Sequence, residues 1–121
     1  MTTLVALLLA GAAGAATRYV VDVAVTARTP VGFPWGTAVV NVAGSLLLGC
    51  VAGAVAARGA PDAVATVAGT GFCGAFTTFS TVVQQTLGLV EERRWRAAAL
   101  NLSTVLAGVA AAGLGWAIAA A

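Results

Sequence analysis

Hydroxyl side chains, among them Thr77, Thr78 and Ser80, lie within an apolar stretch of membrane length, in the string GFCGAFTTFST at residues 71–81. Glycines and phenylalanines accompany them: Gly71, Gly74, Phe72, Phe76 and Phe79. Polar groups at membrane depth are costly unless they meet a hydrogen-bond partner, a cavity or an ion. This combination of hydroxyl, glycine and phenylalanine residues is not expected in a helix that only faces lipid. We therefore take residues 71–81 as the first candidate for a functional site, with ion binding as its chemistry.

A helix that breaks near residues 71–78 would expose unpaired backbone groups inside the membrane. Carbonyl groups at such a break can coordinate a small cation, whereas N–H groups and helix N-termini favour anions. Phenylalanine can also turn the electropositive edge of its ring toward an anion. The alternative is a kinked packing helix whose threonine hydroxyls bond back to their own turn. That alternative suffices for an isolated Thr-Thr pair but does not account for the whole string.

Further polar residues also fall inside or at the ends of apolar stretches. Arg18 and Asp22 stand four residues apart, either as an ion pair on one helix face or as an electropositive vestibule for an anion, and the spacing slightly favours the pair. Asn41 has no obvious partner in its own segment. Its amide could join two helices or donate protons to an anion, and composition does not separate these roles.

The composition places these residues in a membrane protein. The 121 residues are 60% hydrophobic and only 8% charged, whereas soluble domains contain about 25% charged residues. Charges and turn residues divide the chain into four apolar pieces, each long enough to cross a hydrocarbon core, which needs about 20 residues. We predict an all-α membrane protein in a single domain, residues 1–121, with spans at about residues 2–27, 35–57, 63–90 and 97–121.

Several function classes do not fit this composition. The chain has no His, so neither a Ser-His-Asp nor a Cys-His set is possible. No metal-ligand spacing is present, and an enzyme is not expected. The basic residues are all arginines and are scattered, so no basic face for nucleic acid can be assembled. Cys50 and Cys73 lie in apolar segments and are interpreted as small buried thiols rather than a disulfide.

Small residues favour close packing of the spans. Gly49 and Gly53 form a GxxxG step in the second span, and Gly11 and Ala15 form a similar step in the first. Four short helices enclose little volume, and a monomer could hardly surround a polar path. A dimer is therefore expected.

The loop arginines predict an orientation. The first and third loops carry Arg28, Arg93, Arg94 and Arg96, whereas the second loop carries only Arg58. Arginines near the ends of spans tend to stay cytoplasmic. The first and third loops are therefore predicted to lie inside, and both termini outside.

The third-span string strongly resembles the signature of the Fluc/CrcB family of fluoride channels. GAATRY at residues 14–19 resembles the first-helix motif of that family, and WGTAVVNVAGSLLLG at residues 35–49 resembles its second-helix motif. The four-span plan and the length match over essentially the whole chain. The third-helix string is long enough to be specific, whereas the other two motifs would be weak alone.

The resemblance implies a fluoride-specific channel in the cell membrane that lowers cytoplasmic fluoride by passive efflux. Fluoride and membrane lipid are then the expected partners, together with a second subunit. The family implies an antiparallel, dual-topology dimer of four-helix subunits whose third helix is broken mid-membrane. A structural sodium ion, which is not transported, would be held at the dimer centre by backbone carbonyls that match Gly74 and Thr77.

The resemblance also implies residues for the fluoride pore. The family's phenylalanine, asparagine and arginine match Phe79, Asn41 and Arg18, and the hydroxyls of Thr78 and Ser80 complete the predicted lining. Fluoride is small and strongly hydrated, so the water that it loses must be replaced by N–H, O–H and ring-edge contacts. These side chains can supply all three.

The sequence departs from the family pattern in three places. Val82 stands where a second pore phenylalanine is usual, and Gln84 and Gln85 replace an acidic residue often found shortly after. The hydroxyl-lined track of the fourth helix is thin, with polar residues clustered near its start: Asn101, Ser103 and Thr104. Together with the biased loop charges, these departures favour pairing with an oppositely inserted homologue, although a homodimer stays open.

Two other functions stay open at this point. A small four-helix proton-coupled cation or multidrug transporter would need a membrane-embedded carboxylate, and the only candidate is Asp22, with Arg18 beside it. A non-conducting partner subunit is favoured by Val82 and by the bare later part of the fourth span. Asn41, Phe79 and the intact string at residues 71–81 argue against that second alternative.

Overall fold

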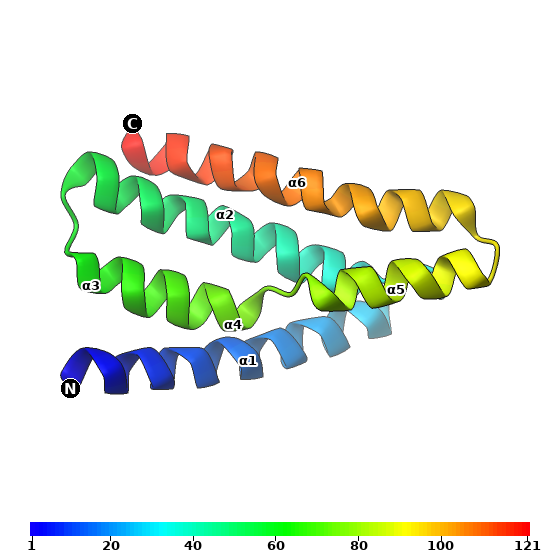
Figure 1. Cartoon of the computed structure of the whole chain (residues 1–121), viewed down its shortest axis with the longest axis horizontal. Coiled ribbons are helices and arrows are strands. Elements are labelled where there is room, and N and C mark those ends of the chain that lie inside the picture. Colours follow the sequence, from blue (N-terminus) through cyan, green and yellow to red (C-terminus); the bar gives the residue numbers. More distant parts are fainter.

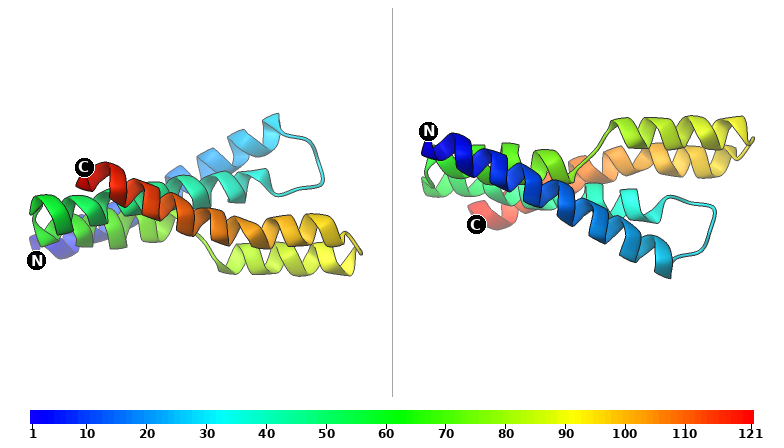
Figure 2. Two further views of the ribbon diagram at one scale, coloured as in Figure 1. Left: turned by 90° about the horizontal axis from the view of Figure 1, so that it is seen from above. Right: turned by 90° about the horizontal axis from the view of Figure 1, so that it is seen from below.

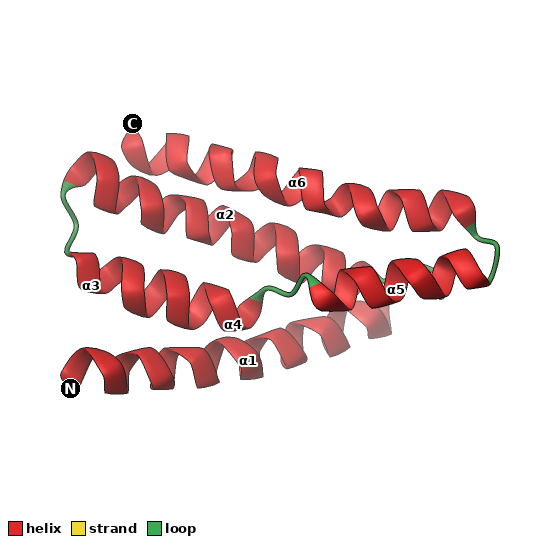
Figure 3. Cartoon of the chain, in the orientation of Figure 1, coloured by secondary structure: helices red, strands yellow, loops and turns green.

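The computed structural model describes all 121 residues, which fold into helices without any strand (Figures 1 and 3). Three spans are unbroken: α1 (Thr2–Arg28), α2 (Trp35–Arg58) and α6 (Trp95–Ala120). The third is divided into α3 (Asp62–Val64), η1 (Ala65–Cys73), α4 (Gly74–Phe76) and α5 (Ser80–Glu91). All 4 spans are long and apolar enough to cross a membrane. The predicted all-α fold of four spans is confirmed.

Proline and glycine set the ends of the first two spans. α1 ends at Arg28 because the next residue, Thr29, is extended, with φ −117° and ψ 155°, just before Pro30. A residue that precedes proline is disfavoured in the helical region. α2 ends at Arg58, and the next residue, Gly59, has the left-handed φ of 66° and donates its N–H to the Ala54 carbonyl. Glycine adopts this helix-ending conformation without steric cost.

The second and fourth spans pack backbone against backbone through glycines. A Cβ added to Gly49 would overlap the Ala112 carbonyl, and one added to Gly115 would overlap the Leu46 carbonyl. A Cβ on Gly53 would lie 2.7 Å from the Trp116 carbonyl oxygen. The predicted GxxxG step of α2 therefore lies in this contact, as expected for small residues between membrane helices.

In α1 the closest backbone approach is made at Gly14 rather than at the predicted step of Gly11 and Ala15. A Cβ on Gly14 would overlap the Phe72 carbonyl of η1, whereas one on Gly11 would make an ordinary contact at 3.8 Å. Ala15 is exposed. The rotation of α1 against the third span decides which small residue is needed, and that rotation cannot be read from spacing alone.

The two parts of the third span lie against different neighbours (Figures 1 and 2). η1 and α4 pack on α1, whereas α5 packs on α6. η1 is a π-helix of 9 residues, a wider helix that is rare and frequently found at functional sites. The predicted interruption of the third helix is confirmed, but it lies at residues 77–79, after the glycines at 71 and 74, which are both helical.

The loops divide between the two ends of the bundle. Both termini lie at the same end as the α2–α3 loop, and the other two loops lie at the opposite end, where the α1–α2 and α5–α6 hairpins diverge (Figures 1 and 2). The four arginines of the first and third loops therefore share one end. Only 18 of 121 residues are buried, so most of the apolar surface is left for lipid or a partner subunit. The inward orientation of the arginine-rich end stays a prediction.

Candidate functional site

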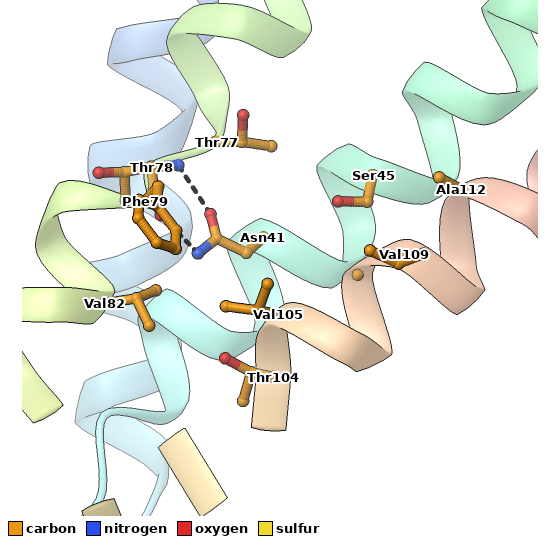
Figure 4. A pocket seen from close by; sticks show the side chains of 11 residues that line it. Asn41, Ser45, Thr77, Thr78, Phe79, Val82, Thr104, Val105, Val109 and Ala112 are labelled. Carbon is orange, nitrogen blue, oxygen red and sulfur yellow. Dashed lines mark hydrogen bonds between the residues drawn. The ribbon is translucent and has the colours of Figure 1, made fainter. Parts of the chain in front are cut away.

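The interruption of the third span is formed by one hydrogen-bonded pair between α2 and the chain at residue 78 (Figure 4). Asn41 donates from Nδ2 to the Thr78 carbonyl at 2.7 Å, and its Oδ1 accepts the Thr78 N–H at 2.7 Å. In a continuous helix the Thr78 N–H would bond to the carbonyl of Gly74, four residues earlier. Asn41 thus takes a bond that would continue the helix, and the Gly74 carbonyl loses its helical partner.

The residues on either side of Thr78 show how the chain leaves one helix and enters the next. Thr77 is extended, with φ −86° and ψ 160°, although its N–H still donates to the Cys73 carbonyl at 3.0 Å. Its hydroxyl donates to the same carbonyl at 2.9 Å. The alternative in which a threonine hydroxyl bonds back to its own turn therefore describes the Thr77 side chain, but not the interruption as a whole.

Hydroxyl groups close the first turn of α5. The Thr78 hydroxyl donates to Thr81 Oγ1 at 3.0 Å, and Thr78 Oγ1 accepts the Thr81 N–H at 3.4 Å. Ser80 Oγ lies 3.5 Å from the same Thr78 hydroxyl. A side-chain oxygen that accepts an N–H three residues later stabilises a helix N-terminus, where backbone donors lack helical partners. Thr78 therefore links the break to the start of α5.

A cavity of about 270 Å³ lies between the break, α2, α5 and α6 (Figure 4). Its polar lining comes from the amide of Asn41 and from hydroxyl-bearing residues on three elements. The apolar lining includes Phe79, which is 64% exposed, and Val82, which is only 1% exposed. Its lining residues include Asn41, Ser45, Thr78, Phe79, Val82 and Thr104. Ser80 is exposed and does not line this cavity.

Arg18 lies beside the break, but not as the partner of Asp22. Its Nη1 donates to the Thr77 carbonyl at 3.4 Å, and the only ion pair in the chain joins Arg94 to Glu92. The predicted Arg18–Asp22 ion pair is therefore wrong. The carboxylate of Asp22 instead lies against Gly36, in the first turn of α2, where the helix dipole favours a negative charge. Packing of α1 on α2 and α4 sets both positions.

Of the residues predicted to bind sodium, Gly74 lies in α4 just before the break and Thr77 is its first residue. Gly74 is exposed, and an added Cβ would meet nothing closer than the Gly69 carbonyl of η1, at 3.8 Å. Crowding within one chain therefore does not explain a glycine here. The Thr77 carbonyl accepts only the long bond from Arg18 among side-chain donors. No cluster of His, Cys, Asp or Glu suitable for a metal is present.

Two further polar contacts hold α5, and neither was predicted from the sequence. Gln85 donates from Nε2 to the Thr37 hydroxyl of α2 at 3.0 Å. Asn101 of α6 is fully buried and donates from Nδ2 to the Val82 carbonyl at 3.2 Å and to Thr86 Oγ1 at 3.0 Å. Amides in apolar segments are the only signal that could have found them, because uncharged polar groups in a membrane usually bond across helices. Cys50 and Cys73 are free thiols.

These features define a small multi-pass membrane protein in which one interrupted span borders a partly polar cavity. The chain belongs to the CrcB family, because the family model described as CrcB-like protein, Camphor Resistance (CrcB), matches residues 5–116.

Similar proteins carry a common name. The chain is 50% identical over 121 residues to fluoride-specific ion channel FluC 1 of Frankia casuarinae, covering 93% of each chain. It is 50% identical over 105 residues to FluC 1 of Thermobifida fusca, covering 86% of this chain and 84% of the relative. It is 42% identical over 118 residues to FluC 1 of Leifsonia xyli subsp. xyli, covering 95% of this chain and 86% of the relative.

Proposed function

We propose that this chain is a subunit of a fluoride-specific ion channel through which fluoride leaves the cytoplasm passively. The observation that carries the proposal is the Asn41–Thr78 pair, which interrupts the third span beside a cavity with polar lining. The relatives named as fluoride-specific channels support the same function.

The groups around the break suit a small anion. Asn41 uses one of its two amide protons on Thr78, so the second is free for an ion. The Phe79 ring is exposed beside the cavity and can offer its electropositive edge. Arg18 adds positive charge near the Thr77 carbonyl. Fluoride would exchange water for these contacts, which is the requirement for entry of a hydrated ion into a narrow pore.

The backbone at the break suits a structural sodium ion. Carbonyl oxygens coordinate alkali cations in membrane proteins, and Asn41 withdraws the Thr78 N–H from the Gly74 carbonyl. The Thr77 carbonyl keeps room for a second partner beside its long bond from Arg18. The carbonyl groups of Gly74 and Thr77 are therefore suitable ligands for a sodium ion. One chain supplies only these two carbonyls, so a second subunit would be needed to complete the coordination.

We further propose that the chain functions as an antiparallel dimer. Gly74 and Phe79 are both exposed in the middle of the third span, where a polar backbone cannot face lipid without cost. A second subunit over this face would cover both residues. The biased loop arginines favour an oppositely inserted homologue as the second subunit, because a chain that inserts both ways should have little charge bias.

The central test is fluoride efflux from liposomes, read with a fluoride electrode, for the chain reconstituted alone and together with a homologue. We expect Phe79→Ala to lower the flux about tenfold or more, because a ring contact to the anion is lost in a poorly solvated site. Leu87→Ala is the matched control, since Leu87 is also exposed, 57%, and lies on α5 away from the cavity.

Each arm of this test decides between alternatives. Robust flux from the lone chain would favour a homodimer, and flux only with the homologue would favour a heteromer. No flux in either case would point to a non-conducting subunit. Flux that follows the pH gradient would favour a proton-coupled transporter with Asp22 as the carboxylate. Equal effects of Phe79→Ala and Leu87→Ala would contradict the assigned pore.

The sodium proposal has its own test. Gly74→Leu should abolish dimer formation or fluoride flux, because a large side chain would occupy the space beside the freed carbonyls. Gly113→Leu is the control, since Gly113 is exposed on α6 and nothing lies within 4 Å of an added Cβ. Undiminished flux from the Gly74 variant would rule out an ion site at this position.

A further inference from the structure

We propose that Asn101 is a positioning residue that sets the place of α5 on α6 and so fixes one wall of the cavity. The inference rests on the proposed channel function for its effect on conduction. Its geometric part concerns only how α5 is held, and that part can be measured without any ion.

Asn101 joins the two helices through a compact set of hydrogen bonds. Its side chain is 0% exposed. Its Nδ2 donates to the Val82 carbonyl at 3.2 Å and to Thr86 Oγ1 at 3.0 Å, while the Thr86 hydroxyl donates to the same Val82 carbonyl at 2.8 Å. These are the only side-chain hydrogen bonds between α5 and α6. The Asn101 amide therefore determines, through these hydrogen bonds, the position of α5 along α6.

α5 needs such an anchor because the break separates it from the rest of its span. The chain at residues 77–79 is not helical, so the direction of α4 does not dictate the direction of α5. The Asn41 amide holds the backbone at Thr78, before α5 begins. Within α5, Gln85 is bonded to α2 and Val82 is bonded to α6. The place of α5 is therefore set from two sides, and Asn101 supplies the α6 side.

The Asn101 amide is bonded to a residue that lines the cavity from α5, while a second lining residue lies one turn further along α6. Val82 lines the cavity from α5, and its carbonyl accepts the Asn101 amide. Thr104 lines the cavity from α6, where its hydroxyl donates to the main-chain carbonyl of residue 101 at 2.6 Å, a bond that keeps Thr104 on α6 and does not involve the Asn101 amide. A displacement of α5 along α6 would move Val82 relative to Thr104 and change the width of the cavity.

The side chain is not explained by packing alone. Asn101 Oδ1 is buried and has no hydrogen-bond partner, and an unpaired buried acceptor is unfavourable. A leucine of similar size would avoid that penalty. The hydrogen bonds that the Asn101 amide donates to α5 therefore explain an asparagine at this position. A contribution to the stability of the α5–α6 contact explains it less well.

The first test measures geometry. Spin labels at positions 87 on α5 and 106 on α6, both exposed, report the distance between the two helices. Cys50 and Cys73 are first replaced by alanine, so that only these two positions are labelled. Labelled chains are diluted with unlabelled ones, so that only distances within one chain are measured. Asn101→Leu should shift or broaden this distance distribution. Ser103→Ala is the control, because Ser103 is exposed and bonds only to Leu100 of its own helix. Unchanged distances in the Asn101 variant would overturn the proposal, whether or not the chain conducts fluoride.

The second test measures conduction in assembled protein only. Asn101→Leu should lower the fluoride-to-chloride efflux ratio by about fivefold, the factor that corresponds to one hydrogen bond, while Ser103→Ala should leave it unchanged. A wild-type ratio in the assembled variant would overturn the effect on the cavity. If Asn101→Leu does not assemble, Thr86→Val removes one of its two partners and decides instead: a lowered ratio supports the proposal, and an unchanged ratio contradicts it. Absence of flux from the wild-type chain, both alone and together with the homologue, would instead reject the channel function.

Discussion

The first half of the third span, η1 and α4, packs on α1 through close backbone contacts, whereas the second half, α5, is held by side-chain hydrogen bonds. Gly14 approaches the Phe72 carbonyl, and Gly71 would place a Cβ 3.0 Å from the Leu7 carbonyl oxygen. No side-chain hydrogen bond joins η1 to α1. By contrast, Gln85 bonds to α2, and Val82 and Thr86 bond to Asn101 of α6.

This difference shows how an interrupted helix can be kept in a membrane. Lipid supplies little hydrophobic force between helices, so close packing at small residues and interhelical hydrogen bonds are the available means. The first half is held by close packing at small residues, and the second half is held by interhelical hydrogen bonds. Asn41 bonds to the chain between them. The break is stable because each half has neighbours of its own and does not depend on helical continuity.

The largest expected effect is on the glycine contact of the first half. Gly14→Ala should destabilise the folded chain by about 3 kcal/mol, the upper part of the range for overpacking, because the new methyl group overlaps a backbone carbonyl that cannot change rotamer. Gly88→Ala is the control on α5, where nothing lies within 4 Å, and it should stabilise the helix by about 0.5–1 kcal/mol. Denaturant titration in detergent measures both. Equal stability of the two variants would contradict the comparison.

The next effect concerns the junction between the halves. Asn41→Ala removes two hydrogen bonds, at a cost of about 2 kcal/mol, and frees the Thr78 N–H to bond to the Gly74 carbonyl. Hydrogen exchange at the Thr78 amide should change, and fluoride flux should fall about tenfold or more. Ser45→Ala is the control for hydrogen exchange, because Ser45 also lies on α2 beside the cavity but makes no side-chain hydrogen bond to the break. Exchange and flux that stay at wild-type values would show that Asn41 does not maintain the break.

The smallest effect is expected where α5 meets α2. Thr37→Val removes the acceptor of Gln85 Nε2 and should cost about 1 kcal/mol, the net value of one hydrogen bond. Thr66→Val is the control, since the exposed Thr66 hydroxyl bonds only to Asp62 of the same span. The same denaturant titration distinguishes them. A loss as large as that of Gly14→Ala would mean that α5 is less independent of the first half than its contacts indicate.

Much of the fold was predictable because membrane spans obey local rules. Continuous apolar length gave the four helices, and proline and glycine marked the turns. The string at residues 71–81 indicated an interrupted helix, although the glycines suggested a slightly earlier position than residues 77–79. Gly71 is needed instead for the approach to α1. Glycine spacing predicted close packing of α2 but not its partner α6, and in α1 the closest approach lies at Gly14 rather than at the step of Gly11 and Ala15.

The partners of the polar side chains were decided by the tertiary structure alone. Arg18 bonds to a carbonyl 59 residues away rather than to Asp22, four residues along its own helix. Asn41 bonds to a residue 37 positions away, and Asn101 to one 19 positions away. Hydropathy and turn preference act between near neighbours in the sequence, so they determined the spans and their ends. Which amide meets which carbonyl depends on the rotation and offset of packed helices, and those are properties of the assembled bundle.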